Sequence, residues 1–404
     1  MQCSALDALP EPQRDAAQAA LRRVLGSVPV EAFVPVSGGA TAATICRIDA
    51  GGRSLLLRIE GPASPLRNPH QYVSMRMAAE AGIAPRLHDA DAEGRVAVID
   101  FIVQRPLNTY PGGPAALARA LGELLARLQA TPAFPFFVEY PAIVARLWAH
   151  VCRTGLFAPG VLDACTARLN DISRAYRAGP TNLVSSHNDS IPANILFDGT
   201  RLWLVDWESA YRNDPLVDVA IIADNLARTP ELETMLLHAW LQRAPDAALR
   251  ARLALARALT RLYYAGVLLS ASATFPRAAP NHDLTAPTLA EFNDAVAGGR
   301  LTPGAPGTKH ILGKMWLAAF MTGVAAPGLS RPFDGPAGGI AVARFHTKLV
   351  PFRTVPDENN RDWSRLARRR RCAVCVRDLA DGAECASVDR ADGRTPRPHP
   401  GQAR

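Results

Sequence analysis

Hydrophobic and polar positions follow two different periods in the first part of the chain. Residues 12–25 have apolar side chains at the three- and four-residue spacing of an amphipathic helix. From residue 30 to residue 60 apolar and polar positions alternate, which is the pattern of half-buried β-strands. Gly51-Gly52 interrupts this alternation and predicts a tight turn between two strands.

A second helix and a further strand complete this first region. The helix is expected over His70–Ala81, because Gly82 and Pro85 follow it as stop signals. The short apolar run Val96–Ile102 then predicts a strand. Together these elements predict one N-terminal lobe over residues 1–105, built on a small antiparallel sheet.

Helical spacing dominates residues 106–328. Leucines recur every three or four positions between residues 117 and 128, and helical patterns return over 215–270 and 308–322. One β-rich island, residues 183–206, lies between them. The chain therefore predicts an α+β fold of two lobes, in which the second lobe, residues 106–328, is mainly helical.

The positive charge of the chain lies mostly at its C-terminal end. The formal net charge is +8, and residues 341–404 carry 14 basic and eight acidic residues. The rest of the chain is nearly neutral, which argues against a nucleic-acid partner for the folded body. Residues 329–404 lack a sustained period, so we expect a disordered basic tail there, with nucleic-acid binding by its arginine run as the alternative.

Cysteine usage and hydropathy indicate a cytoplasmic protein. The seven cysteines are an odd number, and no secretory leader precedes them. No uninterrupted apolar stretch reaches the roughly 18 residues of a membrane span, so we expect no membrane partner. Cys372 and Cys375 are spaced as in some zinc sites, but no further ligands follow at finger-like spacing.

Two polar residues with the character of a metal site flank a predicted hairpin in the β-rich island. With a turn at Asp198-Gly199, Asn194 faces Val205, so Asn194 and Asp206 lie about one strand spacing, roughly 5 Å, apart. An amide oxygen beside a carboxylate suits Mg²⁺, which prefers a few protein oxygens together with substrate phosphates. We therefore expect Asn194 and Asp206 to hold magnesium.

The segment SHNDSIPANILFDGTRLWLVDWE resembles the catalytic segment of the choline/ethanolamine kinase and aminoglycoside phosphotransferase superfamily, which has a protein-kinase-like fold. The resemblance rests on H-x-D-x-x-x-x-N, an apolar hairpin and D-W-E. It extends more weakly over residues 35–325 and does not cover the tail. It implies ATP as co-substrate, Mg²⁺ as cofactor and transfer of the γ-phosphoryl group to a hydroxyl of a small acceptor.

The resemblance also makes residues 1–105 the nucleotide-binding lobe and residues 106–328 the catalytic and acceptor-binding lobe. It implies a role for each residue of the segment. Asp189, which lies five residues before Asn194, becomes the catalytic aspartate that orients and deprotonates the hydroxyl. His187 becomes a structural residue of the loop. Glu208 binds metal or acceptor or has a structural hydrogen bond, and Asp218 supports the catalytic loop from the following helix.

The N-terminal lobe contains the residues that the resemblance assigns to ATP. The turn Ser37-Gly38-Gly39 lies between two strands, where its backbone amides would cover the phosphates. An ordinary hairpin turn is the alternative. Arg58 takes the strand position at which protein kinases and most aminoglycoside phosphotransferases have a lysine, and an arginine there resembles the choline kinase branch. Its guanidinium can hold phosphate oxygens as a lysine can.

The helix glutamate that usually pairs with this base falls on Gln71, which can hydrogen-bond Arg58 but supplies no charge. Either the pairing is relaxed, or Glu80 or another acid replaces it. This departure leaves open a catalytically silent, nucleotide-binding pseudokinase.

The acceptor is expected to be choline or a related amino alcohol. A cationic acceptor of this kind needs an aromatic surface, whereas a polycationic aminoglycoside needs several acids lining the cleft. Residues 207–328 contain 10 acidic and 11 basic residues, so they form no acidic funnel. Aminoglycosides, sugars and homoserine stay open as alternative acceptors. The aromatic candidates are Trp207, Tyr211, Trp240, Tyr263, Tyr264 and Trp316.

Overall fold

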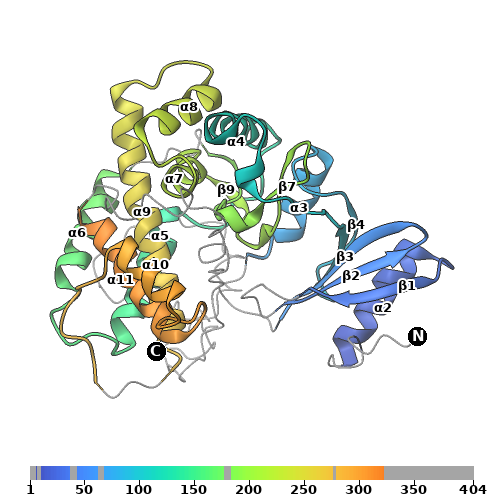
Figure 1. Cartoon of the computed structure of the whole chain (residues 1–404), viewed down its shortest axis with the longest axis horizontal. Helices are drawn as coiled ribbons and strands as arrows, with labels where there is room; N and C mark the ends of the chain where they lie inside the picture. Colours follow the sequence, from blue (N-terminus) through green and yellow to red (C-terminus); the bar gives the residue numbers. More distant parts are fainter. Residues whose placement is uncertain are drawn as a thin grey trace, which may run out of the picture. The chain divides into compact units, whose positions relative to one another are not determined.

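A computed structural model describes residues 6, 11–36, 43–61, 68–176, 183–275 and 279–322, which are parts of one compact unit (Figure 1). The predicted turn Ser37-Gly38-Gly39 and the predicted tail 329–404 lie outside the described residues.

An antiparallel five-stranded sheet, counted over the described residues, forms the first part of the fold, as predicted. Its strands are β1 (Val30–Pro35), β2 (Thr44–Ala50), β3 (Arg53–Ile59), β4 (Leu87–Asp91) and β5 (Val96–Asp100), in the order β1-β2-β3-β5-β4. Alternation along β3 buries Leu55 and Leu57 completely on one face. Helix α2 (Glu11–Leu25) packs its apolar stripe, including Ala17 and Ala20, into the same cluster.

Helix α3 (Gln71–Glu80), which confirms the helix expected over His70–Ala81, connects the sheet to the second part of the fold. Tyr72, Met75 and Ala78 on this helix belong to a hydrophobic cluster that also contains side chains of α4 (Gly113–Gln129). The cluster therefore crosses the boundary expected at residues 105 and 106, and a division into separate lobes stays a prediction.

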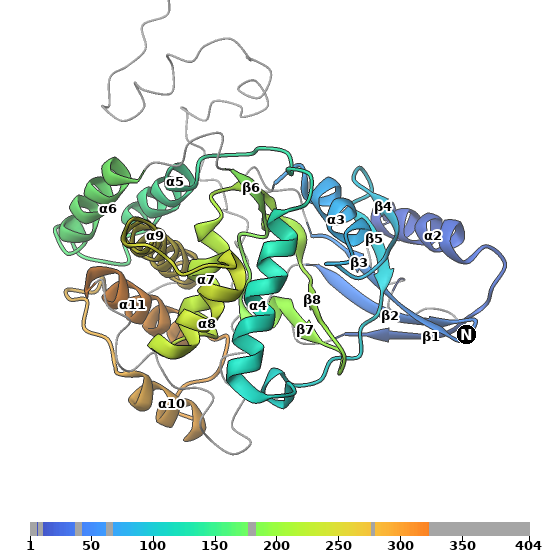
Figure 2. The same cartoon turned by 90° about the horizontal axis from the view of Figure 1, so that it is seen from above.

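Helices build most of the second part of the fold. They are α5 (Tyr140–Arg153), α6 (Asp163–Ala175), α7 (Leu216–Asn225), α8 (Pro230–Leu241), α9 (Ala247–Ser272), α10 (Leu289–Ala297) and α11 (Pro306–Thr322). Helix α9 packs against α5, α7 and α11, and α4 lies beside α8 (Figure 2). Gly122 permits this close approach, because a Cβ there would lie 2.4 Å from the carbonyl oxygen of Leu236. None of the described helices combines the length and the apolar character needed to cross a membrane.

Short strands and single helical turns make up the β-rich island. They are β6 (Val184–Ser186), η3 (Pro192–Asn194), β7 (Ile195–Phe197), β8 (Leu202–Leu204), η4 (Trp207–Ser209) and β9 (Tyr211–Asn213), with η1 (Leu107–Thr109) further upstream. Phe197 pairs with Leu202, which confirms the predicted hairpin register. The backbone N–H of Val205 donates to the carbonyl oxygen of Asn194 at 3.0 Å, so these residues face each other as expected.

Candidate active site

The loop between β6 and η3 is held by one buried carboxylate. Asp218 lies in the first turn of α7 and has no exposed surface. Four donors of the loop satisfy its two oxygens: the hydroxyl of Ser186 (2.7 Å), the backbone N–H groups of His187 (2.8 Å) and Asn188 (2.9 Å), and the hydroxyl of Ser190 (3.0 Å). A buried carboxylate with this many partners fixes the backbone on both sides of Asp189.

Asn188 turns the chain at the centre of this loop. Its φ is +60°, in the left-handed region that asparagine tolerates better than most residues. Its side-chain amide donates to the carbonyl oxygens of Ser209 (2.9 Å) and Tyr211 (3.2 Å) and accepts from the amide of Asn213 (2.7 Å). These bonds join the loop to the segment that follows Asp206, whose own φ is +70°.

Both oxygens of the Asp189 carboxylate accept hydrogen bonds. The side-chain amide of Asn194 donates to Oδ2 at 2.9 Å and also to the Asp189 carbonyl oxygen at 2.8 Å. The hydroxyl of Tyr264, on α9, donates to Oδ1 at 2.9 Å. Burial and the Asp189 charge raise the pKa of Tyr264 well above its ordinary value, so this hydroxyl keeps its proton.

His187 has a fully buried ring that contacts the far side of the hairpin. Its Nε2 lies 2.9 Å from the carbonyl oxygen of Val205, which can only accept, so this nitrogen carries the hydrogen. Its ring packs edge-on against Trp207 with centroids 4.8 Å apart. Burial lowers the pKa of His187, and a neutral imidazole is consistent with the structural role that the resemblance implies.

Arg58 meets carboxylates from two distant parts of the chain. Its guanidinium lies 3.1 Å from Asp206 Oδ1, 3.0 Å from Glu208 Oε2 and 3.6 Å from Glu60 Oε1. The residue is 8% exposed. Burial alone would lower the pKa of Arg58, but the three carboxylates outweigh it and raise the pKa above its ordinary value. Three negative charges around one positive charge leave this site anionic and suited to a further cation.

Gln71 hydrogen-bonds a carboxylate of the sheet. Its side-chain amide donates to Glu60 Oε2 at 2.8 Å, and both residues are buried. Glu80, the other acid considered for this helix, is exposed at its C-terminal end. Glu60, which directly follows β3 and does not come from the helix, is therefore an acid that contacts both Arg58 and Gln71.

Asn194 and Asp206 offer ligands of the kind that Mg²⁺ prefers. Because the NH₂ group of Asn194 donates to Asp189, its amide oxygen is the end available to a cation. Within the described ranges no group of three or more His, Cys, Asp or Glu side chains could hold a metal ion by itself. Oxygens of this kind bind Mg²⁺ together with phosphates and water, and the role of the two residues as magnesium ligands stays a prediction.

Comparison with known proteins identifies the family. The model of the "Phosphotransferase enzyme family" matches residues 32–255, more than half of the chain. The chain belongs to this family. Protein LicA of Haemophilus influenzae is 39% identical over 54 residues, and the match spans only a fifth of that relative's length.

Solved structures of other proteins have folds similar to that of this chain. A choline/ethanolamine kinase family protein from Mesorhizobium loti has a TM-score of 0.53 at 19% identity, covering 83% of this chain and all of its own. Choline kinase LicA from Streptococcus pneumoniae has a TM-score of 0.52 at 15% identity, covering 75% and 98%. The predicted α+β, kinase-like fold is therefore confirmed.

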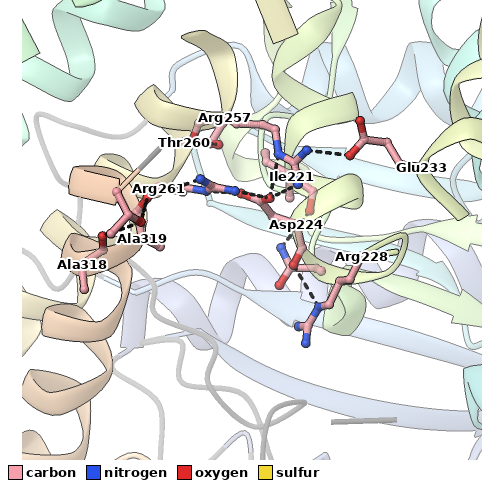
Figure 3. Close-up of polar contacts among 11 residues, drawn as sticks. Ile221, Asp224, Arg228, Glu233, Arg257, Thr260, Arg261, Ala318 and Ala319 are labelled. Carbon is pink, nitrogen blue, oxygen red and sulfur yellow. Dashed lines mark hydrogen bonds and ion pairs between the residues drawn. The ribbon is translucent and has the colours of Figure 1, made fainter. Parts of the chain in front are cut away.

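A buried ion-pair cluster holds the other end of α7 in this phosphotransferase family member (Figure 3). Two arginines of α9 donate to the Asp224 carboxylate at 2.6–2.8 Å: Arg257 donates to Oδ1, and Arg261 donates to both oxygens. Glu233 of α8 accepts from Arg257 at 2.6 Å, and Arg228 donates to the carbonyl oxygen of Asp224 at 3.0 Å. Helix α7 is thereby fixed to the helix that carries Tyr264, while its first turn carries Asp218.

Two site residues were not predicted from the sequence. Tyr264 appeared there only as one aromatic candidate, because nothing in the spacing of residues 75 positions apart places its hydroxyl on Asp189. Glu60 was missed although it directly follows the strand that carries Arg58. The alternation of that strand was the available signal, since it places residues 58 and 60 on the same face.

We expect Asp224→Asn to lower the free energy of unfolding by about 3–5 kcal/mol, because Arg257 and Arg261 would lose their shared buried counter-charge. Urea denaturation measures the loss. Asp171→Asn is the control: this carboxylate pairs with Arg174 on an exposed helix surface, so the expected change is below about 1 kcal/mol. Equal losses in the two variants would contradict a stabilising role for the cluster.

Proposed function

We propose that this phosphotransferase family member is an ATP-dependent kinase that transfers the γ-phosphoryl group to the hydroxyl of choline or a related amino alcohol. The observation that carries the proposal is the surroundings of Asp189: one carboxylate oxygen faces the candidate metal ligand Asn194, and the other faces a row of aromatic side chains. The names of the choline kinase neighbours support the same acceptor class.

The proposed reaction assigns a task to each group of the site. Asp189 orients the acceptor hydroxyl and takes its proton as the oxygen attacks the γ-phosphorus. Arg58 holds phosphate oxygens of ATP with its planar fork. Mg²⁺ bound by Asn194 and Asp206 would supply charge neutralisation on the phosphates. Most of the catalysis then comes from positioning and electrostatics.

A row of aromatic side chains lies on the side of Asp189 where the acceptor is proposed to bind. Ring centroids lie 6.1 Å apart for Tyr140 and Tyr263, 5.6 Å for Tyr263 and Tyr264, and 5.5 Å for Tyr264 and Trp316. Tyr263 and Trp316 are partly exposed. An ammonium group over these faces gains cation–π attraction, and the Tyr264 hydroxyl leads from the rings to Asp189.

Asp189→Ala should abolish turnover and leave the affinity for Mg·ATP within a few-fold, because the residue acts on the acceptor and not on the nucleotide. ADP release is followed with choline, ethanolamine, homoserine, simple sugars and aminoglycosides, and the variant serves as the blank. Stimulation by choline or ethanolamine, absent in the blank, is the expected result. Stimulation only by aminoglycosides would contradict the proposed acceptor and indicate an antibiotic phosphotransferase. ATP binding without turnover on any acceptor would favour a pseudokinase.

Trp316→Ala should raise the KM for choline about tenfold with kcat within a few-fold, since a desolvated cation–π contact contributes on the order of 1–2 kcal/mol. Steady-state kinetics with varied choline measure the effect. Trp240→Ala is the control, because the Trp240 indole donates to Gln129 between α4 and α8, outside the aromatic row. An unchanged KM in the Trp316 variant would remove this residue from the acceptor site.

A further inference from the structure

We propose that Glu60 is the residue that positions Arg58 for nucleotide phosphates, so that a strand carboxylate replaces a helix carboxylate in this chain. The inference rests on the proposed function, because it concerns how the same site binds ATP. It is carried by a contact that links Glu60, Arg58 and Gln71.

Glu60 is held rigidly where β3 ends. Its backbone N–H donates to the carbonyl oxygen of Arg95 at 3.0 Å, and its own carbonyl oxygen accepts from the side-chain amide of Gln13 at 3.1 Å. The residue is only 2% exposed. Since both backbone groups are bonded to other elements, the carboxylate has a fixed starting point and little freedom to turn towards solvent.

The two carboxylate oxygens of Glu60 face different partners. Oε2 accepts from the Gln71 amide at 2.8 Å, and Oε1 lies 3.6 Å from Arg58 Nε. A glutamine at position 71 can donate to this carboxylate, whereas a glutamate would place a second buried negative charge against it. The neutral helix residue therefore complements an acid on the strand, and together they supply Arg58 with one negative charge.

Glu60 differs from the other two partners of Arg58. Asp206 is a proposed magnesium ligand, and Glu208 follows it in the same turn, so under the proposed function bound Mg·ATP would compete with both contacts of Arg58. Glu60 directly follows the strand that carries Arg58, two residues away from it, and its contact does not depend on the second part of the fold. It would keep Nε of the guanidinium oriented while the two terminal nitrogens exchange carboxylates for phosphate oxygens.

A charge-swap series on the full chain tests the proposal. Calorimetry measures the affinities for Mg·ATP and for adenosine in Glu60→Gln, in Gln71→Glu and in the double variant. Glu60→Gln should weaken Mg·ATP binding about tenfold and adenosine binding less than twofold, because Arg58 acts on phosphates. Gln71→Glu should also weaken Mg·ATP binding, and the double variant should recover to within about threefold of the wild type.

Glu80→Gln is the matched control, an exposed acid at the end of the helix that carries Gln71, and should change neither affinity. Three results would overturn the proposal: unchanged Mg·ATP affinity in Glu60→Gln, equal losses for adenosine and Mg·ATP, or losses that add in the double variant. If Glu60→Gln does not fold, the Mg·ATP affinity of the double variant tests the proposal instead. A loss of tenfold or more in that affinity would contradict it. A wild-type protein that fails to bind Mg·ATP would overturn the proposed function as well, which separates the two failures.

Discussion

The buried carboxylate of Asp218 is the constraint on which the site depends. It brings together four donors of one short loop, two of them backbone N–H groups, and so determines the path of the chain through Asp189. The opposite end of its helix is fixed by Asp224 to the helix that carries Tyr264. One rigid helix thus relates the loop bearing Asp189 to the aromatic row beside it.

A second constraint connects the sheet to this helical framework. Arg58 on β3 reaches Asp206 and Glu208 after β8, some 150 positions later, and the site around it contains more negative than positive charge. A buried arginine with such partners keeps its charge, and the remaining negative charge favours a divalent cation. The same contacts that join two parts of the fold therefore create the electrostatic conditions that binding of Mg·ATP would need.

Local features of this fold and site were predictable from the sequence pattern, and most long-range contacts were not. The contact between Asp218 and the loop was expected only from the family resemblance. The turn at Asp198-Gly199 determines the hairpin register and hence the approach of Asn194 to Val205. Helices α5, α6 and α10 and strand β4 were not predicted; the side chains of β4 are all half-buried, which leaves no clear alternation. The contact between Tyr264 and Asp189 depends on how α9 packs. The two residues are 75 positions apart, so no sequence spacing indicates their contact.

The proposed reaction transfers the γ-phosphoryl group of ATP to a hydroxyl held by Asp189. Mass spectrometry tests it on ATP whose three non-bridging γ-oxygens are ¹⁸O, incubated with the protein, Mg²⁺ and choline. Such transfer predicts a choline phosphate ester that contains all three labelled oxygens and retains the acceptor's own unlabelled oxygen at the new bond. Labelled inorganic phosphate without any labelled ester would contradict it, because the γ-phosphoryl group would then have passed to water.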